Sequence, residues 1–200
     1  GLYPVDRKHG TSWLGEDDWI TCQSYIDDSN VLKTSYSNDE TGMDVDQFDL
    51  VLPGEGLGAG PDAGPGGDVL IRHYEIKNRG SEAKETGFIV YSSFTVSGQD
   101  IRGSLFDFDS EALVHYRHGY YISISADRDV YQFQLGNNAL DAASRAELYG
   151  ADAIGMMADA ALSWKLGEIL PGETRSFTLY ICASNTLRGV KELVGATKKY

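Results

Sequence analysis

Two groups of carboxylates are the residues of this sequence whose types and spacing come closest to a metal site. They are Asp44, Asp46 and Asp49 in one segment and Asp107, Asp109 and Glu111 in another. Carboxylate oxygens are the ligands that Ca²⁺ prefers, but neither group has the spacing, central glycine or closing glutamate of an EF-hand. On strands such residues more often form a solvated face, so we predict no metal ion at either group.

The histidines are too scattered for a zinc site, and no nucleophile is activated by its neighbours. His115 and His118 are three residues apart, which places them on opposite faces of a strand, and His9 and His73 are isolated. The sequence holds no HExxH or G-x-S-x-G pattern. We therefore nominate no catalytic, cofactor-binding or metal-binding residue.

The glycine-rich segment 54–67, GEGLGAGPDAGPGG, lacks the chemistry of a phosphate cradle. It has no Lys-Ser/Thr pair, does not match G-x-G-x-x-G and does not open a helix. Because Leu57 is its only side chain large enough to help build a core, we expect a long loop between strands.

Aromatic rings could form a platform for sugars, and thiols could form a disulfide. The aromatic candidates are Trp13, Trp19, Trp164, Tyr120 and Tyr121. In an all-β domain most such rings belong to the core or the sheet surface. Cys22 and Cys182 both lie in apolar strand-like runs, so we expect two small buried side chains and no bridge.

Composition excludes several classes of partner. The chain has 200 residues, 42% of them hydrophobic, which is enough to bury a sizeable core. No run approaches the roughly 20 apolar residues of a membrane span. The net charge of −13 opposes binding to nucleic acid or anionic membranes. Such acidity is also typical of adaptation to high salt, which stays a hypothesis.

Almost all elements that position these residues are strands. The clearest segment is 68–96, where two runs rich in β-branched and aromatic residues flank the polar turn 78–82. Phe88 and Val90 share one face of the second run with Phe94 and Val96 at period two. The turn chemistry favours an antiparallel hairpin.

The remaining patterns complete the predicted fold class. Further strands are expected at 19–25, 31–37, 43–52, 112–118, 120–126, 130–135, 160–166 and 175–183. A short helix is expected at 141–149, with Asp141 as N-cap and Gly150 as stop, and segment 186–200 has apolar residues at helical spacing. We predict an all-β protein, a large antiparallel two-sheet sandwich with one or two short helices.

The order of these features resembles the N-terminal β-sandwich (supersandwich) domain of bacterial and archaeal glucoamylase-type enzymes. These form glycoside hydrolase family 15, with glucodextranases and related α-glucosidases. The resemblance covers nearly the whole chain. The matching residues are Leu2-Tyr3-Pro4, DVLIRHYEIKN at 68–78, Tyr91-Ser92-Ser93-Phe94, Ala112-Leu113-Val114-His115-Tyr116, Ala160-Ala161-Leu162-Ser163-Trp164 and Leu170-Pro171-Gly172-Glu173-Thr174.

The resemblance implies a function outside this sequence. In that family the sandwich precedes an (α/α)₆ barrel, whose two catalytic glutamates carry out inverting, exo-acting hydrolysis of α-linked glucans. Residues 1–185 would be a non-catalytic sandwich domain, inactive alone, and 186–200 the start of a helical linker to the catalytic barrel. The implied partners are that barrel and α-glucan.

Two alternatives stay open. The chain could instead be a free-standing carbohydrate-binding or interaction module, since fold alone supports either function. Two unpaired-looking cysteines and no recognisable signal peptide favour the cytoplasm, with an extracellular location if a signal peptide has been removed.

Overall fold

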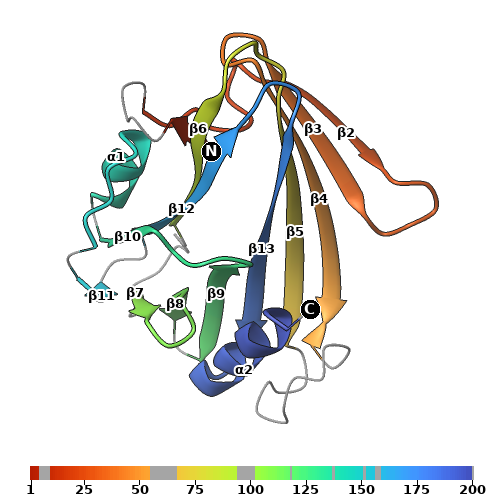
Figure 1. Ribbon diagram of the computed structural model, residues 1–200. Helices are drawn as coiled ribbons and strands as arrows, with labels where there is room; N and C mark the ends of the chain where they lie inside the picture. Colours follow the sequence, from red (N-terminus) through yellow and green to blue (C-terminus); the bar gives the residue numbers. More distant parts are fainter. Residues whose placement is uncertain are drawn as a thin grey trace.

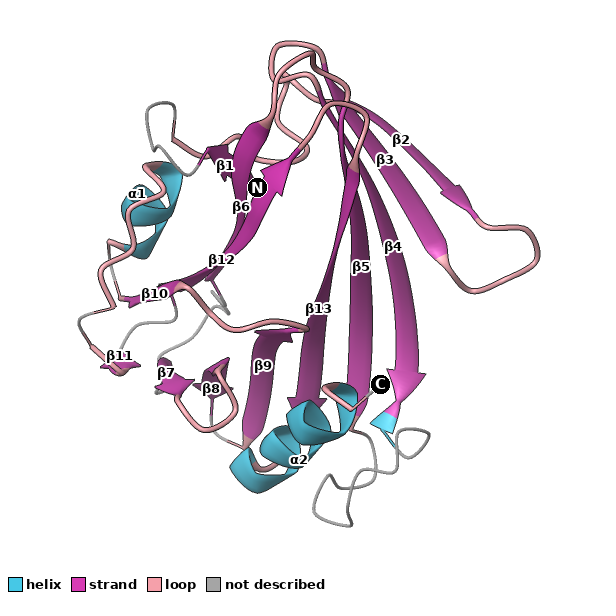
Figure 2. Cartoon of the chain, viewed as in Figure 1, coloured by secondary structure: helices cyan, strands magenta, loops and turns pink. Residues whose placement is uncertain are grey.

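The computed structural model describes residues 1–4, 10–54, 67–93, 102–117, 119–136, 138–150, 152–155 and 159–199. Within these ranges the chain forms thirteen strands in two antiparallel sheets, with two helices, so the predicted all-β sandwich is confirmed (Figure 2). The loop expected between residues 54 and 67 is described only at its ends, and His9, His118, Phe94 and Val96 also lie outside the described residues.

The smaller sheet holds four strands in the order β1-β6-β12-β10 (Figure 1). Their bounds are Leu2–Pro4 for β1, Lys84–Ser93 for β6, Asp159–Ile169 for β12 and Gln132–Leu135 for β10. Helix α1 (Ala139–Ser144) covers the outer face of this sheet, where Ala142 and Ala143 pack with Ile89 and Ala161.

The larger sheet holds nine strands in the order β11-β7-β8-β9-β13-β5-β4-β3-β2. Their bounds, in chain order, are Ile20–Tyr25 for β2, Leu32–Asn38 for β3, Met43–Pro53 for β4, Asp68–Asn78 for β5, Arg102–Asp107 for β7, Ala112–Arg117 for β8, Tyr120–Ala126 for β9, Ile154–Gly155 for β11 and Thr174–Ser184 for β13. The sequence patterns missed β1, β7 and β11, of which β1 and β11 are too short to show a period.

Helix α2 (Leu187–Thr197) packs on the outer face of the larger sheet, against β13 and β9. The hydroxyl of Thr186 caps it by accepting a hydrogen bond from the backbone N–H of Gly189 at 2.9 Å. This confirms the amphipathic helix expected in segment 186–200, whereas the division of the chain at residue 185 stays a prediction. Neither described helix has the length and apolar character needed to cross a membrane.

The main core lies between the two sheets and is rich in aromatic rings. Phe88 of the smaller sheet lies 4.8 Å from Phe177 and 4.6 Å from Tyr74 of the larger one, between ring centroids. Trp164 lies 5.1 Å from Phe177. The period-two pattern of β6 thus correctly places Phe88 on the core face, with Val90 packed against the same cluster.

The hairpin predicted for 68–96 is wrong, because its two strands lie in different sheets. β5 pairs with β4 and β13, whereas β6 pairs with β1 and β12. Residues 79–83 therefore carry the chain across the sandwich. Residue types typical of turns indicate only that the chain reverses its direction. They do not distinguish a partner in the same sheet from one that faces the first strand across the core.

Asn78 fastens this crossing to the one between β12 and β13. Its side-chain amide donates to the carbonyls of Ile169 at 2.9 Å and Glu82 at 2.8 Å. Its backbone N–H donates to Glu173, and its carbonyl accepts from Gly172. Because Asn78 is fully buried, these bonds replace water for a polar group and hold both corners together.

Two further expectations are wrong. The predicted helix 141–149 instead begins at Ala139, so Asp141 lies in its first turn and Asn138 is the N-cap position. The helix is shifted because Ala139, Ala142 and Ala143 form the face that packs on the sheet. Cys22 is exposed rather than buried, since β2 is the outermost strand of the larger sheet. Cys182 is buried as expected.

Candidate functional site

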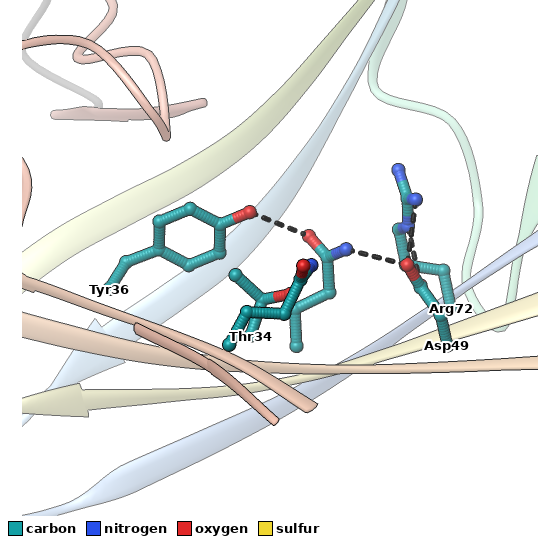
Figure 3. Close-up of polar contacts among 6 residues, drawn as sticks. Thr34, Tyr36, Asp49 and Arg72 are labelled. Carbon is teal, nitrogen blue, oxygen red and sulfur yellow. Dashed lines mark hydrogen bonds and ion pairs between the residues drawn. The ribbon is translucent and has the colours of Figure 1, made fainter. Parts of the chain in front are cut away.

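The larger sheet carries a cluster of hydrogen-bonded polar side chains (Figure 3) on the face that also holds the core residues Met43 and Val45. We call this the inner polar cluster. Its members come from β2, β3, β4 and β5 and are Gln23, Thr34, Tyr36, Gln47, Asp49 and Arg72. Gln23 and Thr34 form one hydrogen-bonded pair, and Tyr36, Gln47, Asp49 and Arg72 form a connected chain beside it.

Strand register brings these residues together. On β4, Gln47 and Asp49 continue the face that begins with the buried Met43 and Val45. Asp49 then lies opposite Arg72 in the pairing of β4 with β5. The face changes from apolar to polar along the strand.

The pair formed by Asp49 and Arg72 fixes the charge of the cluster. Arg72 donates from Nε and Nη2 to the two carboxylate oxygens of Asp49 at 2.7 and 2.9 Å. Burial alone would lower the pKa of Arg72, but the hydrogen bonds and charge of Asp49 raise it. Burial also raises the pKa of Tyr36, which stays a neutral donor.

A chain of hydrogen bonds extends from this ion pair toward Tyr36. Gln47 Nε2 donates to Asp49 at 2.9 Å, and the Tyr36 hydroxyl donates to Gln47 Oε1 at 3.4 Å (Figure 3). Both oxygens of Asp49 are thus engaged, so this carboxylate is not poised as a general base. The cluster can contact a polar ligand through its partly exposed Arg72, but it has no acid and base arranged for hydrolysis.

The first acidic group does not assemble. Asp44 and Asp46 point to the outer face of β4, away from Asp49. Asp44 pairs with Arg79 at 2.8 Å and Asp46 with Lys33 at 2.9 Å. The three predicted carboxylates therefore cannot hold one ion.

The second acidic group is divided as well. Asp107 accepts a hydrogen bond from Lys191 at 2.7 Å and so ties β7 to α2. Burial alone would raise the pKa of Asp107, but hydrogen bonds from Lys191 and Ser110 hold it below the ordinary range. Asp109 is exposed in the following turn.

His115 connects the two sheets across the core. Its Nε2 lies 2.7 Å from the hydroxyl of Ser92 on β6. Burial lowers the pKa of His115 to about 4, against the opposing charge of Asp159, so the ring is neutral near pH 7. Its role is that of a packed core histidine. His73 lies on the opposite face of the sheet, where its Nδ1 is 2.9 Å from the hydroxyl of Thr178.

Most of the aromatic candidates are core residues, as predicted. Trp164 is fully buried, and Trp19 is buried with its Nε1 donating to the Ser12 hydroxyl at 2.9 Å. Trp13 and Tyr121 pack against the satellite clusters under the two helices. Tyr120 differs, because this residue is 73% exposed at the start of β9.

Sequence reasoning found only one member of the inner polar cluster, Asp49. Gln47 and Asp49 share the period-two face of Met43 and Val45, and this was the available signal. The contribution of Arg72 depends on the register of β5 with β4, which no local pattern contains.

A known protein is similar to this chain in sequence, and a solved structure is similar to it in fold. No family model matches the chain. A Methanocaldococcus jannaschii protein described as an uncharacterized glycosyl hydrolase is 23% identical over 186 residues, which are 90% of this chain and 28% of that protein. A bacterial glucoamylase solved in complex with acarbose matches with a TM-score of 0.61 at 10% identity, over 100% of this chain and 28% of that one.

These matches confirm the resemblance at the level of the fold. The whole chain has the fold of a part of a bacterial glucoamylase. In both comparisons this chain spans only 28% of the matched protein, so it corresponds to one part of each of them.

Proposed function

We propose that this chain is the non-catalytic β-sandwich domain of an enzyme that hydrolyses α-linked glucans, and that it stabilises the catalytic (α/α)₆ barrel by packing on it. The observation that carries the proposal is coverage. Essentially the whole chain is matched, but it accounts for only 28% of each matched protein. The substrate class rests on the glucoamylase, and the general chemistry on the glycosyl hydrolase.

The chemistry of the described residues supports a scaffold role. Three buried or half-buried carboxylates are paired with basic side chains: Asp49 with Arg72, Asp46 with Lys33 and Asp107 with Lys191. Inverting hydrolysis needs one protonated carboxyl group and one free carboxylate across a cleft. The catalytic groups are therefore proposed to lie in the remaining part of the enzyme.

The proposal is tested by comparing three proteins made from the natural gene: this chain, the remainder of the polypeptide, and the full length. We expect glucose release from malto-oligosaccharides by the full-length protein and none by this chain. We also expect the remainder alone to be poorly soluble or to unfold at a lower temperature. Glucose release by the pure chain, or a gene that encodes no further domain, would overturn the proposal.

Calorimetry distinguishes the scaffold proposal from the alternative, a free-standing carbohydrate-binding module. A free-standing carbohydrate-binding module should release or absorb heat with maltoheptaose. The scaffold proposal expects no heat from the isolated chain at millimolar sugar. Replacing Arg72 by Ala, in the inner polar cluster, is the variant that should abolish any heat that is observed.

A further inference from the structure

The strand β2 forms a bare edge of the larger sheet. It pairs with β3 on one side, and no described part of the chain pairs with its other side (Figure 1). All six of its residues are exposed. The opposite edge of the same sheet, β11, has only two residues, and the edges of the smaller sheet have three and four. Thus β2 is the longest edge among the described strands.

The backbone direction shows which groups are free. The N–H of Ile26 donates to the carbonyl of Val31, so the backbone N–H and C=O groups of Ile26 face β3. Since backbone direction alternates along an antiparallel pair, Cys22 and Ser24 also point toward β3. Thr21, Gln23 and Tyr25 point their N–H and C=O groups to the free side.

The sequence of β2 lacks the usual protection of an edge. Natural edge strands are commonly blocked by lysine, proline or a bulge. The strand Ile-Thr-Cys-Gln-Ser-Tyr has no charge and no proline, and its pairing with β3 runs without a register shift. It can therefore accept a further strand by main-chain hydrogen bonding.

Acidic residues frame this neutral strand on both sides. They are Glu16, Asp17 and Asp18 before it and Asp27 and Asp28 after it, all exposed. No lysine or arginine lies between residues 9 and 32. In antiparallel self-pairing these two acidic ends would face each other, so a second copy of the chain is disfavoured. A strand with a basic residue at each end is favoured.

A shallow groove adjoins the edge on the outer face. It has a volume of about 520 Å³ and extends from Ile20 and Cys22 across β3, β4 and β5 to Thr174. Alternate side chains of a strand added beside β2 would stand on this outer face, next to the groove. Asp44, Asp46, Glu75 and Lys77 line the groove, and Asp44 and Asp46 are already paired with Arg79 and Lys33. The preference for a basic partner therefore rests on the acidic residues at the two ends of β2.

We propose that β2 is a docking edge that adds, antiparallel, an extended segment of another polypeptide, neutral in its middle and carrying Lys or Arg at both ends. The proposal does not depend on the glucan-hydrolase assignment. Thr21, Gln23 and Tyr25 supply the main-chain hydrogen bonds. The acidic residues at the two ends of β2 select a segment with basic ends.

The probe is a fluorescein-labelled peptide, Lys-Lys-Thr-Val-Thr-Val-Thr-Lys-Lys, titrated with the chain at low salt. We expect saturable binding that weakens as salt rises, because the flanking charges are exposed. Amide exchange should slow at Thr21, Gln23 and Tyr25, while Cys22 and Ser24 are already protected by β3. The same peptide with glutamate in place of lysine is the matched control and should not bind.

A protein variant tests the edge itself. Gln23→Pro removes a free backbone N–H and keeps the backbone bonds to β3, and an edge strand tolerates proline at such a position. It also removes the side-chain bond to Thr34, which Gln23→Ala removes as well. It should weaken binding at least about tenfold, whereas Gln23→Ala should bind within about twofold of the natural chain. Matched melting temperatures of the two variants exclude unfolding as the cause.

Four results would overturn the proposal. They are no binding at millimolar peptide, equal binding of the glutamate peptide, equal binding by Gln23→Pro, and binding without slowed exchange at the three amides. Dimerisation of the chain that Gln23→Pro abolishes would assign the edge to a second copy instead. Binding by this chain but not by the full-length protein would assign it to the protein's own remaining polypeptide.

Discussion

The outer face of the larger sheet has two halves that differ in chemistry, although the same sheet carries both. Under α2, the face of β5 and β13 is apolar, and Val69 and Cys182 pack with Val190, Leu193 and Val194. We call this the covered half. Across β2, β3 and β4 the face is polar and charged, with no described element over it, and we call it the bare half.

The two halves contribute differently to the stability of the fold. Apolar side chains stabilise the fold in proportion to the area they remove from water, which the covered half does by means of α2. Exposed ion pairs add little to stability. Substitutions in the bare half should therefore change the free energy of unfolding less than substitutions in the covered half.

Thiol chemistry should give the largest difference, because each half carries one cysteine on its outer face. Cys22 is exposed on β2, whereas Cys182 is buried, and burial raises its pKa to about 11. Since the thiolate is the reactive form, Cys182 should react with a disulfide reagent on the order of 1,000-fold more slowly than Cys22. Absorbance kinetics with Cys22→Ser and Cys182→Ser measure each rate alone. Similar rates would mean that α2 does not protect its half.

The same cysteine pair shows what local sequence can and cannot predict. Both lie in apolar strand-like runs, and both strands were predicted within one or two residues. Cys182 is buried because β13 is central and covered by α2, and Cys22 is exposed because β2 is an edge. Burial depends on the order of strands in the sheet, which periodicity does not contain.

Similar reasons explain the hairpin and the inner polar cluster. The two runs of 68–96 are strands, as their composition predicts, but the choice between pairing and crossing is made by contacts distant in sequence. Asn78 holds the crossing through Ile169, which lies far along the chain. The pairing of Arg72 with Asp49 likewise needs the register of two strands that are separated in the sequence by residues 54–67.

Truncating a side chain under α2 should have the next largest effect. Leu193 is fully buried between α2 and the sheet. Leu193→Ala should lower the free energy of unfolding by about 3 kcal/mol, because it removes apolar contact and leaves a cavity. Urea denaturation measures the change. Arg188→Ala, on the exposed side of the same helix, is the control and should change it by less than about 0.5 kcal/mol.

The ion pair between Asp107 and Lys191 lies at the border of the covered half. It should contribute less to the free energy of unfolding than the side chain of Leu193. Asp107→Asn should cost about 1 kcal/mol near pH 7, because Asp107 is mostly buried and Lys191 only half so. The folded pKa of Asp107 is lowered, so its contribution is present above the ordinary carboxyl range and is lost as pH falls through the lowered pKa. In urea titrations from pH 7 to pH 3, the free energies of unfolding of the variant and of the natural chain should therefore converge. Exposed Asp109→Asn should show no such convergence.

The smallest effect is expected in the bare half. Asp46 pairs with Lys33 at 2.9 Å, and both side chains are about one third exposed. Asp46→Asn should change the free energy of unfolding by no more than about 0.5 kcal/mol, and salt at about 1 M should remove the difference by screening. Lys33 keeps its contact with the ring of Phe48, 5.4 Å from its centroid, so the strand pairing should survive. A loss above about 1.5 kcal/mol in urea denaturation would show that the bare half stabilises the fold as the covered half does. The charges along β3 and β4 would then be explained by folding, without reference to a partner.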